Sequence, residues 1–198
     1  MVGMYGYSAF RSDDAGSTWQ TALVGIGDPE ITAMVADPGT TGSFLCATQR
    51  RAIYATQDAG VSWVEQSLGL SGNYTTSIAL DPPSGRIWAG DGSGILLSSN
   101  NGISWSYSDF EGDIGATANV VIADPSDASR VFAGTSDAFF KGNVMRSTDG
   151  GLHWSIVFSS PRGPVYDVVV DPADPQAVLA ALGVDVVPGA VVRSTGGG

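Results

Sequence analysis

Apolar residues occur along the chain in short runs, which are separated by clusters of glycine, proline, aspartate and serine. Runs of this length between turn-forming residues predict β-strands. In the stretch 25–68, for example, we expect strands at 31–36, 44–48, 52–56 and 63–67. The pattern contains no amphipathic helix of useful length, so the sequence predicts an all-β fold.

The pattern repeats with a period of about 45 residues. A box of the form Ser/Thr-x-Asp/Asn-x-Gly-x-x-Trp occurs four times, and a fifth copy begins at Ser194 and stops at Gly198. Apolar runs that end in Asp-Pro share this period, so chance similarity is improbable. The Asp-Pro markers begin at Asp37, Asp81, Asp124 and Asp171. The box residues are Ser12, Asp14, Gly16 and Trp19; Thr56, Asp58, Gly60 and Trp63; Ser98, Asn100, Gly102 and Trp105; and Ser147, Asp149, Gly151 and Trp154.

Each box is expected to form the turn between the third and fourth strands of its repeat. The glycine allows a positive φ, and the hydroxyl and the carboxylate can bond the backbone of the turn. The tryptophan can bury its ring between neighbouring repeats, so a Trp→Ala substitution should cost roughly 3–5 kcal/mol. The boxes therefore predict architecture, and we interpret their carboxylates as turn stabilisers rather than as calcium ligands.

A period of about 45 residues is typical of one four-stranded blade of a β-propeller. The sequence thus predicts a single partial propeller domain, 1–198, of about four and a half blades. Both chain ends supply a second and a third strand. Three arrangements are compatible with this: a piece of a longer propeller, four blades with a spare hairpin, or a ring that two chains complete. The expected blades are 25–68, 69–110 and 111–160, with incomplete blades at 1–24 and 161–198.

The box resembles the Asp-box, or bacterial neuraminidase repeat. Proteins that carry it include sialidases, the xyloglucan-cleaving glycoside hydrolases of family 74, sortilin-type receptors and photosystem II assembly factors. The whole repeat is most similar to the last three groups. It consists of an apolar run that ends in Asp-Pro, a strand with Ala-Gly, as at Ala89-Gly90 and Ala133-Gly134, and the box. The resemblance implies boxes on the face away from the ligand site, and a secreted or periplasmic location in many bacterial members. The sequence begins without a recognisable signal peptide, so the compartment stays open.

Composition excludes several functional classes. The chain carries 20 acidic and 9 basic residues, a net charge of −11, which disfavours nucleic acid as a partner. Its apolar runs are too short to span a bilayer. Cys46 and His153 are the only cysteine and histidine, so we predict no disulfide framework, no metal site, no cofactor and no Ser-His-Asp triad. Arg11, Arg146 and Arg193 share one repeat position, which disfavours the converging arginines of a sialidase.

The loops on the face opposite the boxes carry the candidate ligand-binding residues. Aromatic rings stack on sugar faces, and carboxylates bond sugar hydroxyls. Paired carboxylates are also what glycoside hydrolysis requires, although no catalytic residue is identified. The most concentrated acidic segment is 109–113. The candidates are Tyr5, Tyr7, Tyr74, Asp91, Asp109, Phe110, Glu111, Asp113, Asp137 and Phe139.

Three functions remain in competition. The first is a carbohydrate-binding module related to glycoside hydrolases, with a polysaccharide as ligand and with catalysis in isolation disfavoured. The second is a non-catalytic scaffold for protein interaction or assembly. The third is a truncated propeller fragment without an activity of its own. A homodimer that completes the ring is compatible with each of them.

Overall fold

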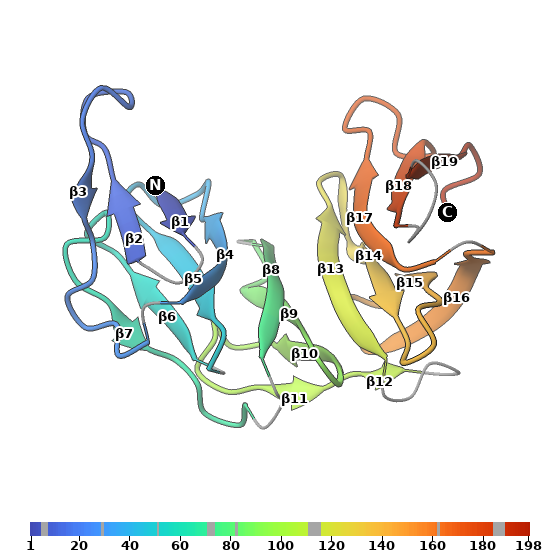
Figure 1. Ribbon diagram of the computed structural model, residues 1–198, viewed down its shortest axis with the longest axis horizontal. Coiled ribbons are helices and arrows are strands. Elements are labelled where there is room, and N and C mark those ends of the chain that lie inside the picture. The colour runs from blue at the N-terminus through green and yellow to red at the C-terminus, as the bar shows by residue number, and fades with distance from the viewer. Residues whose placement is uncertain are drawn as a thin grey trace.

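The computed structural model describes residues 1–4, 8–28, 30–50, 52–70, 74–81, 83–110, 116–161, 163–183 and 189–198. These residues form five β-sheets arranged side by side as an open arc, and they contain no helix (Figure 1). The all-β prediction is therefore confirmed, and so is a partial propeller whose ring is not closed.

The sheets follow one another in chain order, and each sheet contains strands that are consecutive in the sequence. The first sheet holds β1 (Val2–Met4), β2 (Ser8–Arg11) and β3 (Gln20–Thr21); the second holds β4 (Ile31–Ala36), β5 (Phe44–Thr48), β6 (Ile53–Thr56) and β7 (Val64–Glu65). The third holds β8 (Thr75–Asp81), β9 (Arg86–Asp91), β10 (Gly94–Ser98) and β11 (Ser106–Tyr107). The fourth holds β12 (Asp109–Phe110), β13 (Thr117–Asp124), β14 (Asp127–Ser136), β15 (Asn143–Ser147) and β16 (His153–Ser159); the fifth holds β17 (Val165–Val170), β18 (Val178–Leu182) and β19 (Ala190–Ser194).

Neighbouring strands pair antiparallel, as short connections require, with one exception. The exception is β12, which pairs parallel to β16, so that Asp109 lies opposite His153. The sequence placed 109–110 at the end of the third blade, whereas the structure adds them to the outer edge of the fourth sheet. Asp109 therefore lies beside the fourth box and not among the loops of the opposite face.

In the second and third sheets, burial falls from the middle strands towards the outer strand. In the third sheet every residue of β10 is buried, whereas both residues of the outer strand β11 are exposed. A middle strand of the second, third or fourth sheet is buried on both faces because these sheets each pack between two others, and such strands read as continuous apolar runs. The core therefore consists of apolar clusters between successive sheets rather than one central core.

Candidate functional site

The box turns form one repeated hydrogen-bond arrangement. The first-position hydroxyl accepts the N–H of the box glycine, at 2.7 Å for Ser12, 3.0 Å for Thr56, 2.9 Å for Ser98 and 2.8 Å for Ser147. The same hydroxyl donates to the third-position side chain at 2.7–2.9 Å. The chain turns through left-handed residues such as Ala59, φ 58°, and Gly60, φ 82°. Each box thus fixes its own hairpin.

The box carboxylates are engaged by the turn itself. Asp58 accepts the Ser62 hydroxyl at 2.6 Å and the Ser62 N–H at 2.9 Å. These bonds, with the Thr56 hydroxyl, lower the pKa of Asp58 to about 2. Among the described residues, no cluster of three or more histidine, cysteine or acidic side chains is placed to hold a metal. The box carboxylates therefore stabilise the turns in which they lie.

Three of the four box tryptophans are wedged between sheets. Trp63, Trp105 and Trp154 are 4%, 6% and 2% exposed. Trp63 donates its indole N–H to the Ala22 carbonyl at 3.0 Å, which links the second sheet to the first. Trp19 differs, because no sheet precedes it in the arc: it is 47% exposed, contrary to the expected burial of every box tryptophan.

A hollow marks the junction whose box has no tryptophan. It lies between the fourth and fifth sheets and has a volume of about 250 Å³. Val144 and Val192 line it, and their repeat equivalents, Ile95 and Met145, belong to the apolar cluster that holds Trp154. The fifth repeat ends at Gly198 before a tryptophan position is reached. The hollow thus corresponds to the space that an indole fills at the other junctions.

The candidate ligand-binding residues of the opposite face differ in exposure, and some of them lie outside the described residues. Tyr74, which directly precedes β8, is 41% exposed. Asp91 is buried: one carboxylate oxygen accepts the Ser93 N–H at 2.7 Å and the other accepts the Tyr107 hydroxyl at 2.7 Å. Both of its carboxylate oxygens are therefore occupied by protein donors, and Asp91 does not face a ligand. Tyr5, Tyr7, Glu111 and Asp113 lie outside the described residues, and for Phe110 only the backbone is described.

The turn between β14 and β15 carries the most exposed aromatic pair among the described residues. Phe139 is 81% exposed and Phe140 is 64% exposed. Asp137 fixes this turn, because its Oδ1 accepts the N–H groups of Phe139 and Lys141, both at 2.8 Å. Phe140 has a φ of 57°, a left-handed conformation that a bulky residue seldom adopts. Asp137 therefore supports the turn, and the rings of the aromatic pair are directed outward.

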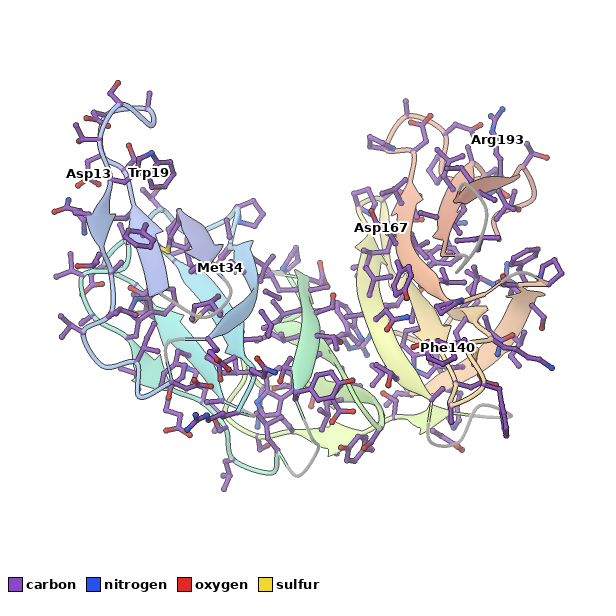
Figure 2. The ribbon with its side chains drawn as sticks, viewed as in Figure 1. Asp13, Trp19, Met34, Phe140, Asp167 and Arg193 are labelled. Atoms are coloured by element: carbon purple, nitrogen blue, oxygen red, sulfur yellow. The ribbon has the colours of Figure 1, made fainter. Side chains whose placement is uncertain are left out.

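A third aromatic ring lies further along the same face. A β-carbon on Gly163 would lie 3.8 Å from the Phe140 carbonyl oxygen and would overlap the backbone of Gly183. The ring of Tyr166 in turn covers Gly183, and Tyr166 is 57% exposed. Figure 2 shows Phe140 and the fourth and fifth sheets from which these residues come. We call Phe139, Phe140 and Tyr166 the aromatic face.

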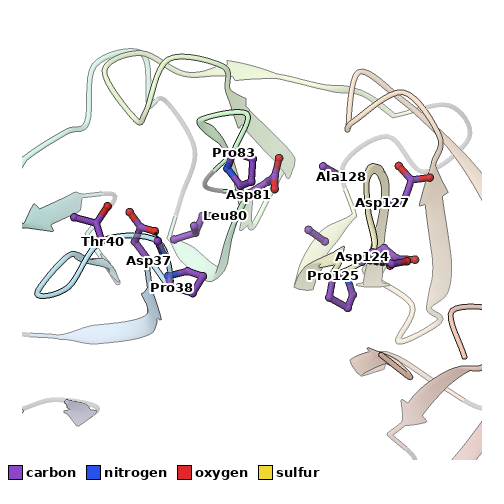
Figure 3. Close-up of a pocket in the computed structure, with 13 residues that line it drawn as sticks. Asp37, Pro38, Thr40, Leu80, Asp81, Pro83, Asp124, Pro125, Asp127 and Ala128 are labelled. Atoms are coloured by element: carbon purple, nitrogen blue, oxygen red, sulfur yellow. Dashed lines mark hydrogen bonds between the residues drawn. The ribbon is translucent and has the colours of Figure 1, made fainter. Parts of the chain in front are cut away.

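A larger hollow lies on the box side of the arc, where no ligand residue was predicted. Three Asp-Pro turns line this volume of about 950 Å³, as Figure 3 shows. The first two turns each bond the box of their own sheet, for example through the Ala59 N–H to the Gly42 carbonyl at 2.9 Å. The repeated Asp-Pro marker is the sequence signal that points to the turns lining this hollow. In the sequence interpretation it indicates only the length of the repeat.

The carboxylates of that hollow are engaged by their own turns. Asp37 Oδ1 accepts the Gly39 N–H at 2.8 Å. Asp124, whose side chain is fully buried, forms an ion pair with Arg130 and accepts the Ser126 N–H at 2.8 Å. Arg130 also donates to the Pro175 carbonyl at 2.8 Å and so joins the fourth sheet to the fifth. These contacts make the Asp-Pro turns part of the framework.

The fold defines a class: the chain is part of a β-propeller, with successive radial sheets and an open ring. No protein-family model and no curated protein matches the sequence. Among solved structures, the GH74 xyloglucanase from Xanthomonas campestris is similar with a TM-score of 0.77 at 19% identity, over 99% of this chain and 35% of that one. An ancestral GH74 enzyme gives 0.71 at 24% identity, over 91% and 24%.

The protein YCF48, in a structure with a bound D1 peptide, is similar with a TM-score of 0.56 at 17% identity, over 76% of this chain and 47% of that one. The chain therefore spans less than half the length of each of these three proteins. At such identities the likeness establishes the propeller fold and leaves the function to be argued from the site. In the part of the chain that the structure describes, no helix is long and apolar enough to cross a membrane.

Proposed function

We propose that this chain is a non-catalytic binding module that holds a peptide segment of a partner protein on its aromatic face. The observation that carries the proposal is the exposure of Phe139, 81%, and Phe140, 64%, on a turn fixed by Asp137. Exposed apolar surface of this kind typically marks an interaction site. Aromatic anchors supply much of the binding energy in protein interfaces.

The backbone of the turn supports binding by its rigidity. Asp137 accepts two N–H groups with one oxygen, and its own carbonyl accepts the Phe140 N–H at 3.1 Å. Because the turn is already ordered, little conformational entropy remains to be lost when a partner binds. The similar propeller YCF48 was solved with a bound peptide, which is consistent with this use of the fold.

Carbohydrate is the second candidate ligand. It is favoured by the exposed Phe139 ring, which can stack on the face of a sugar, and by the similarity to GH74 enzymes. Hydrolysis is less well supported, because a glycosidase needs two free carboxylates at the bond to be cleaved. Asp91 and Asp137 instead use carboxylate oxygens to stabilise turns.

Selection of a random peptide library on the immobilised chain tests the proposal. We expect enriched peptides with apolar side chains, and we expect Phe139→Ala to weaken their binding roughly 30-fold or more, as at an interface hot spot. Leu152→Ala is the matched control, because Leu152 is 50% exposed on a box turn of the opposite face and should not affect binding. Thermal unfolding of both variants should match the parent, since neither side chain is buried.

The same variants separate the two ligand classes. Affinity electrophoresis in xyloglucan should leave the parent chain unretarded under the peptide proposal. Retardation that Phe139→Ala abolishes, without any enriched peptide, would favour carbohydrate instead. Enriched peptides that bind Phe139→Ala and the parent equally would refute the aromatic face as the site.

A further inference from the structure

The outer face of the fifth sheet has the pattern of a sheet-to-sheet interface, and none of the other four sheets that the structure describes packs on it. Val169, Leu179 and Val191 are 48%, 38% and 71% exposed. The pairing registers make Val169 and Leu179 the repeat equivalents of Ile122 and Phe132. Phe132 is fully buried against the fifth sheet, and Ile122 packs against the same cluster. The same positions thus form the next junction wherever a following sheet is present.

An arginine contact also recurs at the junctions. Arg11 in the first sheet donates to the Ala59 carbonyl of the second box at 3.4 Å. Arg146 in the fourth sheet donates to the Gly197 and Gly198 carbonyls of the fifth box at 2.9 and 3.0 Å. Both arginines precede the first box residue, and each reaches the box turn of the sheet that follows. Arg193 has the same repeat position in the last sheet, and its side chain is exposed.

The N-terminal end of the arc presents the complementary half of such a junction. Trp19 already has the box geometry, with its indole N–H donating to the Gly16 carbonyl at 3.1 Å, as Trp105 does to Gly102. It is nevertheless 47% exposed, because each box tryptophan packs against the preceding sheet and the first box has none. Asp13 of the same turn is half exposed and forms an ion pair with Arg11 at 2.6 Å, so Arg193 is directed to the turn backbone rather than to a free carboxylate.

We propose that two copies of this chain join head to tail, with the Trp19 end of each packed on the Val169–Leu179–Val191 face of the other. Trp19 then lies against Leu179 and Val191, and Arg193 donates to the Ala15 carbonyl, the repeat equivalent of Ala59. Figure 1 shows both ends of the arc open towards the same side, and Figure 2 places Trp19 and Arg193 at those two ends. In this proposal a two-fold axis on the open side of the arc relates the two copies, so that both pairs of ends meet.

A second copy fits these faces because it supplies the required groups in their repeat positions. The first box offers a preformed indole and the Ala15 carbonyl, in a turn with the same bonds as the boxes at the internal junctions. The net charge of −11 opposes association at low ionic strength. Screening by salt should therefore strengthen a dimer that is held by apolar contacts.

Light scattering coupled to size exclusion, at concentrations up to about 100 µM, tests the proposal. We expect twice the chain mass of 20.3 kDa, and we expect Trp19→Ala and Leu179→Glu each to weaken the dimer about 100-fold or more, since each dimer has two copies of the contact. Leu152→Ala, another exposed apolar side chain, should dimerise as the parent does. Circular dichroism checks that each variant is folded. A parent monomer over the whole range would show that something other than a second copy covers the two faces.

A mixing experiment tests the head-to-tail geometry. Trp19→Ala keeps an intact C-terminal face and Leu179→Glu keeps an intact N-terminal face, so an equimolar mixture can form one complete contact. We expect the mixture to contain dimers at a concentration at which each variant alone is monomeric. If Trp19→Ala dimerises alone, or if mixing rescues nothing, the contact joins like ends or does not involve these faces, and the proposal is wrong.

Discussion

Removal of one wedged indole should destabilise the arc strongly, and Trp154→Ala is the clearest case. Trp154 is 2% exposed and packs with Trp88 and Met145 in the cluster between the third and fourth sheets. A tryptophan side chain buries about 150–250 Å², which at about 25 cal/mol per Å² corresponds to about 4–6 kcal/mol as an upper bound. Measured truncations of buried aromatic residues fall at about 3–5 kcal/mol, and we expect a loss in that range.

Trp19→Ala is the matched control for that substitution, because the box is the same and only the preceding sheet is absent. With the Trp19 ring 47% exposed, about half the loss is expected, roughly 2 kcal/mol. Both changes are made in the Leu179→Glu chain, which keeps the N-terminal end free. Thermal unfolding followed by circular dichroism should show Tm falling by roughly 6–20 °C for Trp154→Ala and by about half of that for Trp19→Ala. An equal fall in Tm for the two variants would refute the claim that Trp154 is stabilised by packing between two sheets.

The remaining predictions concern the turns and the core. The pKa of Asp58 is lowered to about 2, so its contribution to the free energy of unfolding is complete above its unfolded pKa near 4 and is lost as pH falls towards 2. Asp58→Asn keeps an acceptor oxygen, as Asn100 does, but it does not titrate. The variant should therefore lose less stability than the parent between about pH 4 and pH 2 in acid unfolding. Gly25→Ala should cost at least about 2 kcal/mol in urea unfolding, because φ is 94° and the new methyl group would overlap the Trp63 carbonyl, whereas Gly196→Ala meets nothing within 4 Å and should be neutral. Burial raises the pKa of Cys46 to about 12, so its thiol should react with a disulfide reagent only after unfolding.

The repeated boxes made most of the fold predictable. The box turns can be predicted from the sequence because their serine, aspartate and glycine form hydrogen bonds with one another and with the backbone of the same turn. These bonds span at most four residues. The ends of the strands were displaced by a few residues, as at β14, which is longer than its apolar run. The parallel pairing of β12 was not predictable, since it depends on a contact between Asp109 and a strand that lies more than forty residues later.

The candidate site was less predictable, because side-chain orientation and local capping do not follow from residue type. Asp91 and Asp137 were chosen as acidic groups near aromatic residues, and both carboxylates instead accept N–H groups of their own turns. The exposed Trp19 was missed for a different reason. The box pattern with its tryptophan is similar in all four full copies, whereas burial depends on a neighbouring sheet that only the arrangement in space can reveal.

Hydrogen exchange of the indole N–H groups, measured by NMR in the Leu179→Glu chain, tests the central claim that box tryptophans are wedged between radial sheets. The account predicts five indole signals, of which Trp63, Trp88, Trp105 and Trp154 exchange slowly and Trp19 exchanges fast. Single Trp→Phe substitutions assign the signals. Fast exchange at Trp63, Trp105 and Trp154 would place these rings in water and would contradict the architecture.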